Sequence, residues 1–104
     1  MDRLQVIAQP RRQAILHILW DGPVAVSDIA AQVGVTIGAV SQHLARLHHA
    51  GLVTVRQEGR RRLYAADRDA LADLAPLLEA MWRADLDRLA SKAERVHQRR
   101  SGGR

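Results

Sequence analysis

Residues 36–50 carry the clearest hydrophobic pattern of the chain, and their spacing predicts an amphipathic helix. Apolar side chains recur there every three or four residues, which at 100° per residue gathers them on one stripe facing a core. The stripe consists of Ile37, Val40, Leu44 and Leu47. Thr36 is a residue type that caps helices, and Gly51 stands where a left-handed stop is common. The opposite face holds small and hydrogen-bonding residues, which are Gly38, Gln42, Ala45, Arg46 and His49, with Ser41 at its flank.

Three shorter helices are predicted ahead of this one, at the apolar segments 3–8, 10–20 and 26–33. Pro10 suits the first turn of the second helix, because its missing N–H has no helical partner there in any case. Gly34 ends the third helix and leaves only a tight turn before Thr36. Two helices joined in this way form a helix-turn-helix over residues 26–50, although helix pairs with short turns also occur in plain bundles.

A β-hairpin is predicted directly after the helix-turn-helix, over residues 52–65. β-Branched side chains alternate in residues 52–56, a polar turn occupies residues 57–60, and residues 61–65 return as the second strand. A hairpin in this place is typical of a wing. The expected fold class is therefore mainly α with a small β-hairpin, a winged helix-turn-helix that fills residues 1–98 as a single domain.

The last third of the chain predicts a long helix over residues 77–98. Asp67 or Asp69 would cap a short helix before it, and Pro76 either kinks that helix or starts the long one. The apolar stripe of the long helix is too long for a small domain to cover, so we expect a homodimer formed with the segment 3–8. The interface residues expected on this ground are Leu4, Ile7, Leu78, Trp82, Leu86 and Leu89. Residues 99–104 form a basic tail that we expect to be flexible.

Positive charge is concentrated in the first part of the chain. The formal net charge of the 104 residues is +5, with eight basic and four acidic residues in residues 1–64 and eight and seven in residues 65–104. The excess therefore accompanies the candidate helix-turn-helix, as binding to DNA phosphates would require. A solvated basic face without a ligand is the alternative, and charge alone does not decide between the two.

The polar face of the helix 36–50 predicts contacts to double-stranded DNA. Bulky residues would block a helix from entering the major groove, and base edges must be met by hydrogen-bond donors and acceptors. Ser41 and Gln42 are the first candidates for base contacts, and Thr36 brings the helix N-terminus toward a phosphate. The full predicted set is Thr36, Ser41, Gln42, His43 and Arg46 on the helix, with Arg60, Arg61 and Arg62 on the wing for phosphates or a minor groove.

Other classes of function find little support in the sequence. The chain has no cysteine, which excludes disulfides, thiolate metal sites and cysteine nucleophiles. It has no glycine-rich phosphate loop and no supported catalytic grouping, so we expect no enzyme activity and no cofactor. The start lacks a signal-peptide pattern and no segment is long and apolar enough to span a membrane, which predicts a cytoplasmic protein without a membrane partner.

Two stretches give the chain a family resemblance. Pro10-Arg11-Arg12-Gln13-Ala14-Ile15-Leu16 is similar to a "DPTRRxIL" opening, and the second stretch runs from Ala39-Val40-Ser41-Gln42-His43-Leu44 to Ala50-Gly51-Leu52-Val53. With Gly59-Arg60-Arg61-Arg62-Leu63-Tyr64 as wing, nearly the whole chain resembles the ArsR-type (ArsR/SmtB-like) winged helix-turn-helix repressors. The resemblance implies a homodimeric bacterial transcriptional repressor that binds an inverted-repeat operator and is released when a signal arrives.

The chain departs from this family at its metal sites. Metal-sensing relatives carry a Cys-Val-Cys-Asp run where this chain has Ala25-Val26-Ser27-Asp28, so the thiolate sensor is missing. A second family site pairs carboxylates and histidines on the last helix; here Asp85 and Asp87 are present, but His97 is out of step. We therefore predict no metal site. The effector stays open between an unmatched metal, a small molecule, a partner protein and none.

A protein-docking module without DNA binding is the alternative function, because winged helices also serve in that role. Such a module would show an apolar outer face on the helix 36–50. The polar face and the basic wing favour DNA instead.

Overall fold

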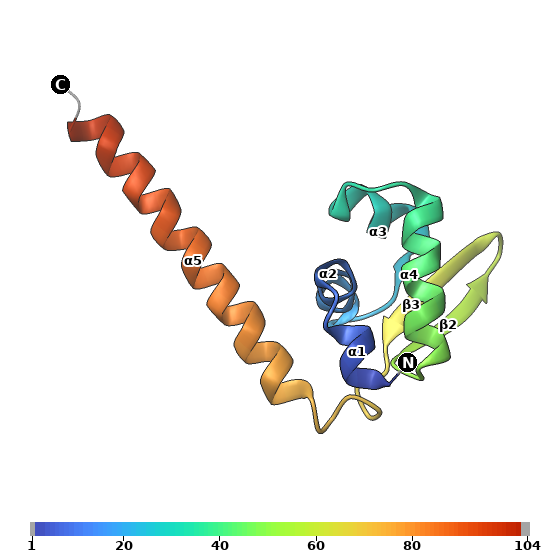
Figure 1. Ribbon diagram of the computed structural model, residues 1–104. Coiled ribbons are helices and arrows are strands. Elements are labelled where there is room, and N and C mark those ends of the chain that lie inside the picture. Colours follow the sequence, from blue (N-terminus) through green and yellow to red (C-terminus); the bar gives the residue numbers. More distant parts are fainter. Residues whose placement is uncertain (1, 103–104) are drawn as a thin grey trace. The chain divides into compact units, whose positions relative to one another are not determined.

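The computed structural model describes residues 2–102, and their side chains as far as residue 88. The chain divides into two compact units, residues 1–73 and residues 74–104, which are described separately below. The first unit contains the elements α1 (Arg3–Ile7), α2 (Pro10–Leu19), β1 (Val24–Ala25), α3 (Val26–Val33), α4 (Ile37–His49), β2 (Val53–Glu58) and β3 (Arg61–Ala66) (Figure 1). The second unit is built on one helix, α5 (Ala75–Gly102).

Local signals in the sequence set the ends of the helices. Pro10 is the first residue of α2, and Gln9 caps this helix by accepting a hydrogen bond from the Arg12 amide. Gly34 ends α3 in the left-handed conformation at φ 77°, where its N–H donates to the Ala30 carbonyl at 2.9 Å. The Thr36 hydroxyl caps α4 by accepting from the Ala39 amide at 3.1 Å, as predicted.

Gly51 ends the last turn after α4 with φ 77°, as its place in the sequence predicts. Its N–H donates to the His48 carbonyl at 2.9 Å, and the Leu52 N–H donates to the Leu47 carbonyl at 3.0 Å. The chain therefore leaves α4 in a fixed direction and enters the first strand of the wing.

The sheet of the first unit has three antiparallel strands in the order β1-β3-β2. The hairpin β2–β3 is the predicted wing, with strands that each extend slightly further than expected. The strand β1 is an addition to the prediction, because two residues are too few to show an alternating pattern. It pairs Val24 with Tyr64 and Ala25 with Leu63, and so attaches the base of the wing to the start of α3.

The core of the first unit consists of side chains from its helices and its wing. The fully buried ones include Ile15, Leu16, Ile29, Val40, Leu44, Leu47, Leu52 and Leu71. The predicted stripe of α4 is therefore confirmed at Val40, Leu44 and Leu47. Ile37 is a correction, because it was predicted on the same stripe and is 55% exposed.

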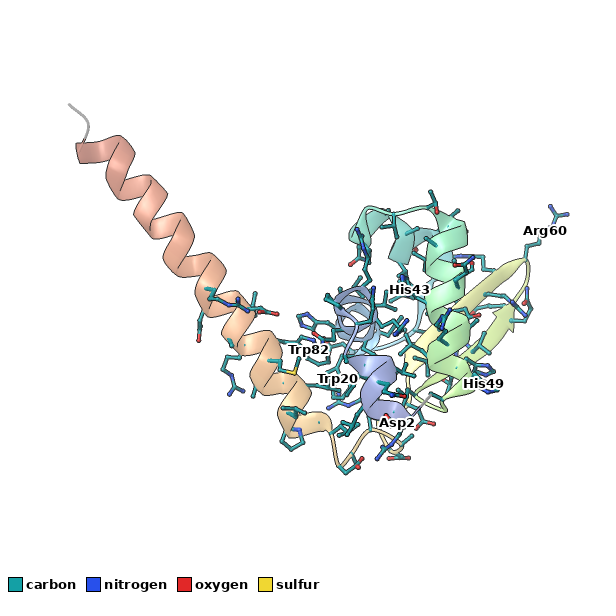
Figure 2. All side chains as sticks on the ribbon, viewed as in Figure 1. Asp2, Trp20, His43, His49, Arg60 and Trp82 are labelled. Carbon is teal, nitrogen blue, oxygen red and sulfur yellow. The ribbon has the colours of Figure 1, made fainter. Side chains whose placement is uncertain are left out.

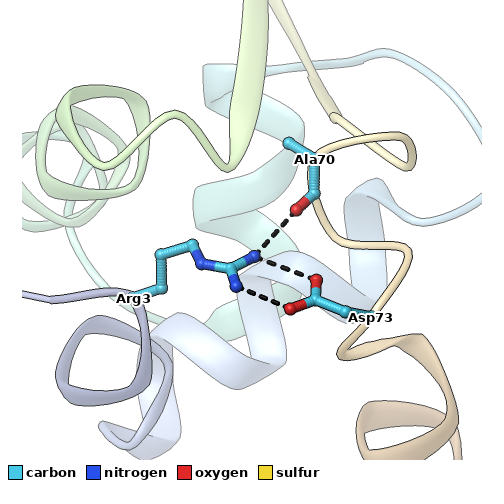
Figure 3. A network of polar contacts seen from close by, with 3 residues as sticks. All are labelled: Arg3, Ala70 and Asp73. Carbon is cyan, nitrogen blue, oxygen red and sulfur yellow. Dashed lines mark hydrogen bonds and ion pairs between the residues drawn. The ribbon is translucent and has the colours of Figure 1, made fainter.

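The segment between the wing and α5 is a second correction. A short helix was expected there, and residues 68–74 form turns instead. Asp67 still acts locally as predicted, since its carboxylate accepts from the Ala70 amide at 3.1 Å. Arg3 of α1 fixes the segment by donating to the Ala70 carbonyl at 2.9 Å and to both carboxylate oxygens of Asp73 at 3.0 and 2.6 Å (Figure 3).

The second unit starts where Pro76 predicted a new helix. Pro76 lies in the first turn of α5, where a missing N–H costs no helical hydrogen bond. On this helix Leu77 and Leu86 are exposed, whereas Leu78 and Trp82 are buried. The side chains of Leu89 and His97 lie outside the described residues. Within the described part of the chain, no helix is long and apolar enough to cross a membrane.

Candidate nucleic-acid interface

The helices α3 and α4 form a helix-turn-helix within the first unit (Figure 1). The turn Gly34-Val35-Thr36 is closed by the Gly34 and Val35 amides, which both donate to the Ala30 carbonyl. Ala30 and Ile29 of α3 are buried, as are Val40 and Leu44 of α4, so each helix contributes an apolar side to the core. The core thereby fixes which face of α4 remains in contact with solvent.

The exposed face of α4 is polar and carries no acidic residue. Ser41, Gln42, Arg46 and His49 are exposed on this helix, and the cap residue Thr36 is exposed at its start. Of the predicted contact residues, Thr36, Ser41, Gln42 and Arg46 are therefore presented to solvent together. Small side chains at Gly38 and Ala45 keep this face open to a close approach.

A hollow of about 490 Å³ lies beside this face. Its lining consists of Val6 from α1, of Gln42, Ala45, Arg46 and His49 from α4, and of Ala50 directly after that helix. The side chains with hydrogen-bonding groups in this lining are an amide, a guanidinium and an imidazole. The surface beside α4 is therefore concave, and it contains no carboxylate that would repel a phosphate.

His43 lies differently from its predicted neighbours. It is half-buried on the side of α4 that faces α2, and its Nδ1 atom is buried without a hydrogen-bond partner among the described residues (Figure 2). Burial lowers the pKa of the imidazole, and the positive charges of Arg12, Arg11 and Arg46 lower it further. His43 is therefore a neutral side chain beside the core and a weaker candidate for a base contact.

Arg12 is a positioning residue that the sequence pattern does not reveal. The helix dipole disfavours a cation in the first turn of α2, which suggests a phosphate or solvent as partner for Arg12. The structure gives it another one, because Arg12 is 7% exposed and its Nε donates to the Val6 carbonyl at 2.5 Å. Burial and the nearby charge of Arg46 lower the pKa of Arg12. Arg12 thus attaches α1 to α2 behind the exposed face of α4.

The three arginines at the wing tip differ in their surroundings. Arg60 lies at the tip and points away from the domain (Figure 2). Arg61 forms an ion pair with Asp28 of α3 at 3.3 Å, with both side chains largely exposed. Arg62 is exposed, and no ion pair of Arg60 or Arg62 occurs with the side chains up to residue 88. Arg60 and Arg62 are therefore better placed than Arg61 for contacts to phosphates.

The predicted dimer residues divide into buried and exposed ones. Ile7 is 5% exposed in the core of its own unit, so it offers little surface to a partner. Leu4 and Leu86 are largely exposed, and Leu77, which was not in the predicted set, is exposed as well. Of the predicted dimer residues whose side chains are described, Leu4 and Leu86 are therefore the ones presented to solvent.

No group of three histidine or acidic side chains that could hold a metal ion occurs in the part of the chain whose side chains are described. On α5, Asp85 instead accepts a hydrogen bond from Arg88. The predicted absence of a metal site involving His97 stays untested.

A helix-turn-helix with an exposed second helix and a basic β-hairpin defines the class of winged helix-turn-helix DNA-binding proteins. Comparison with known proteins identifies the family within this class. Residues 9–55 match the arsR family of bacterial regulatory proteins. The HTH-type transcriptional regulator Rv2034 of Mycobacterium tuberculosis is 42% identical over 78 residues, which make up 75% of this chain and 73% of the relative.

Solved structures show the same fold. The crystal structure of NolR from Sinorhizobium fredii has a TM-score of 0.68 and 30% identity, and the match covers 76% of this chain and 79% of NolR. The homodimeric winged helix-turn-helix DNA-binding domain of Mb0332 from Mycobacterium bovis has a TM-score of 0.67 and 33% identity, over 76% and 73% of the two chains. This chain belongs to the ArsR family of transcriptional regulators, as the sequence resemblance predicts, and its relatives are not enzymes.

Proposed function

We propose that this protein is a homodimeric repressor that binds an inverted-repeat operator in double-stranded DNA. The observation that carries the proposal is the exposed, acid-free face of α4, which presents Ser41, Gln42 and Arg46, whereas the fully buried side chains of this helix are all apolar. In this proposal α4 enters the major groove and the wing contacts the backbone or the minor groove. A regulator of chromosomal genes would act in the bacterial cytoplasm.

In this proposal, different residues contact the bases and the phosphates. Gln42 can bind an adenine in two places through its side-chain amide, and Ser41 can contact either kind of base. Arg46 can reach a guanine or a phosphate, and Thr36 places the N-terminus of α4 close to the backbone. Arg60 and Arg62 would bind phosphates from the wing, which adds affinity without sequence preference.

The exposed apolar residues outside α4 support the proposed homodimer. Leu4 of α1 and Leu77 and Leu86 of α5 are exposed, and a small domain gains stability by covering such side chains with a second copy. The homodimeric domain from M. bovis supports this reading. A two-fold dimer presents two copies of α4, so the operator would be an inverted repeat with half-sites about one helical turn apart.

DNA capture followed by gel shift tests the function. Duplexes bound by the protein would be recovered from genomic DNA, and one of them compared with a random duplex of equal length at low and high salt. We expect retardation of both duplexes at low salt and a strong preference for the recovered duplex at high salt. No retardation at low salt would contradict the proposal and favour the protein-docking module.

A further inference from the structure

Ile37 is the one residue of the apolar stripe of α4 that is exposed, and all residues of this helix are described. It is the first residue of the helix and is 55% exposed, whereas Val40, Leu44 and Leu47 are fully buried. Its position explains the difference, because the Cα–Cβ bonds of a helix tilt toward the N-terminus. A side chain in the first position therefore extends beyond the helix end, where no earlier turn of α4 lies beneath it.

The exposed neighbours of Ile37 on the helix are small or polar. Gly38 has no side chain, and a Cβ atom built there would meet nothing within 4 Å. Ser41 is exposed one turn further on, at the spacing that places two residues on the same helix face. Ile37 is thus an exposed apolar side chain at the N-terminal end of α4, on the side that carries Ser41.

The chemistry of the major groove limits what such a side chain can recognise. The base edges there present hydrogen-bond donors, acceptors and a single apolar group, the C5-methyl of thymine. An isoleucine side chain makes no hydrogen bond, so covering it with a donor or acceptor would leave that group without its partner. Recognition helices of this type contact bases with their N-terminal residues, which is where Ile37 lies.

We propose that Ile37 packs against the C5-methyl group of a thymine in each half-site, and that it thereby selects a T·A pair beside the bases read by Ser41 and Gln42. This proposal rests on the proposed function, since it names one base that the α4 surface recognises. It makes Ile37 a specificity-determining residue, with an affinity contribution that depends on a single methyl group of the DNA.

Uracil substitution tests the contact, because uracil differs from thymine only in lacking that methyl. Each thymine of a recovered operator would be replaced singly by deoxyuridine, symmetrically in both half-sites. We expect one position at which the substitution lowers wild-type affinity about fourfold per half-site, the effect of one buried methyl-sized group. In Ile37→Ala, affinity for the thymine operator should fall, and uracil at that position should have no further effect.

Two further variants serve as controls. Ile37→Val keeps a branched apolar side chain and should keep the difference between thymine and uracil. Gln42→Ala should lower operator affinity and still show that difference at the same position. Because Ile37 is exposed, Ile37→Ala should unfold at no lower temperature than the wild type, which excludes a folding defect as the cause.

The outcomes separate this inference from the function on which it rests. If the wild type binds the operator but no thymine position responds, or if Ile37→Ala responds as the wild type does, the Ile37 contact is overturned and DNA binding stands. If the wild type binds no recovered duplex, the proposed function and the contact both fail.

Discussion

His43 lies on the helix proposed to bind DNA, but its side chain is half-buried and does not belong to the exposed face. Its Nδ1 atom is buried, and three arginines face the imidazole: Arg11 and Arg12 from α2 and Arg46 from α4 itself. A further positive charge beside these three arginines is unfavourable, and so is the burial of a charged ring. The neutral imidazole is therefore the form that the folded protein holds.

The stability of the protein should consequently decrease in mild acid because of His43. Its pKa is lowered from the model-peptide value of 6.5, so the folded state takes up the proton at a lower pH than the unfolded chain does. As the pH falls through 6.5 toward the lower folded-state pKa, the unfolded state gains protons first, and the free energy of unfolding decreases. Urea unfolding of the wild type and His43→Gln at pH 7.5 and at about pH 5 measures this contribution.

His43→Gln should show a smaller loss of stability between the two pH values than the wild type. His48→Gln changes an exposed histidine of the same helix and is the matched control, with a loss expected to follow that of the wild type. Equal losses for His43→Gln and the wild type would contradict the surroundings described for His43.

At the scale of elements, β1 and an ion pair both connect the wing to the start of α3. The strand β1 pairs with β3 directly ahead of α3, and Arg61 pairs with Asp28 in the first turn of α3. An exposed ion pair contributes about 0–1 kcal/mol, so it positions the side chains more than it stabilises the fold. The same pair occupies a guanidinium that would otherwise be available to DNA.

Mutations in the wing should therefore change DNA affinity to different extents, depending on whether the arginine is paired. Arg60→Ala should weaken binding to operator and random duplexes by the same factor and lower the salt slope by about 1, because it removes one phosphate contact.

Asp28→Asn should strengthen binding to both duplexes by releasing Arg61, and it should do so less in an Arg61→Ala background. Titrations at several salt concentrations measure both effects; a gain from Asp28→Asn that is unchanged by Arg61→Ala would argue against the pair.

Hydrophobic periodicity and helix-capping residues predicted most helices and strands, because both signals depend only on residues that are close in sequence. Thr36, Gly34 and Gly51 act locally, and the stripe of α4 needs only helical geometry. The features that the sequence did not predict depend on contacts between different elements or on helix ends. The exposure of Ile37 comes from its terminal position, the burial of Arg12 depends on the Val6 carbonyl, and β1 exists only because β3 pairs with it.

At the scale of the whole molecule, self-association determines how operators are recognised. A single helix-turn-helix covers one half-site, and linking two of them raises affinity because the second contact is made within the same complex. Leu86 is a useful probe of this association, since it is 58% exposed in the single chain and its replacement should leave the fold unaffected.

Leu86→Glu should shift the protein from dimer to monomer, because a carboxylate would have to be buried at the interface. Analytical ultracentrifugation measures the shift, and operator affinity should fall with it. Asp87→Ala changes the neighbouring exposed position and should leave the dimer intact. A Leu86→Glu protein that sediments as a dimer would show that this part of α5 lies outside the interface.

If the exposed face of α4 reads the DNA sequence, Gln42→Ala should change the preference of the protein for its operator. The measurement is the ratio of affinities for an operator and a random duplex, with Gln32→Ala, an exposed glutamine of α3, as the matched control. We predict that Gln42→Ala lowers operator affinity by about 1–3 kcal/mol, roughly 5- to 150-fold, and leaves random-duplex affinity and salt slope unchanged. An equal loss on both duplexes would contradict the claim.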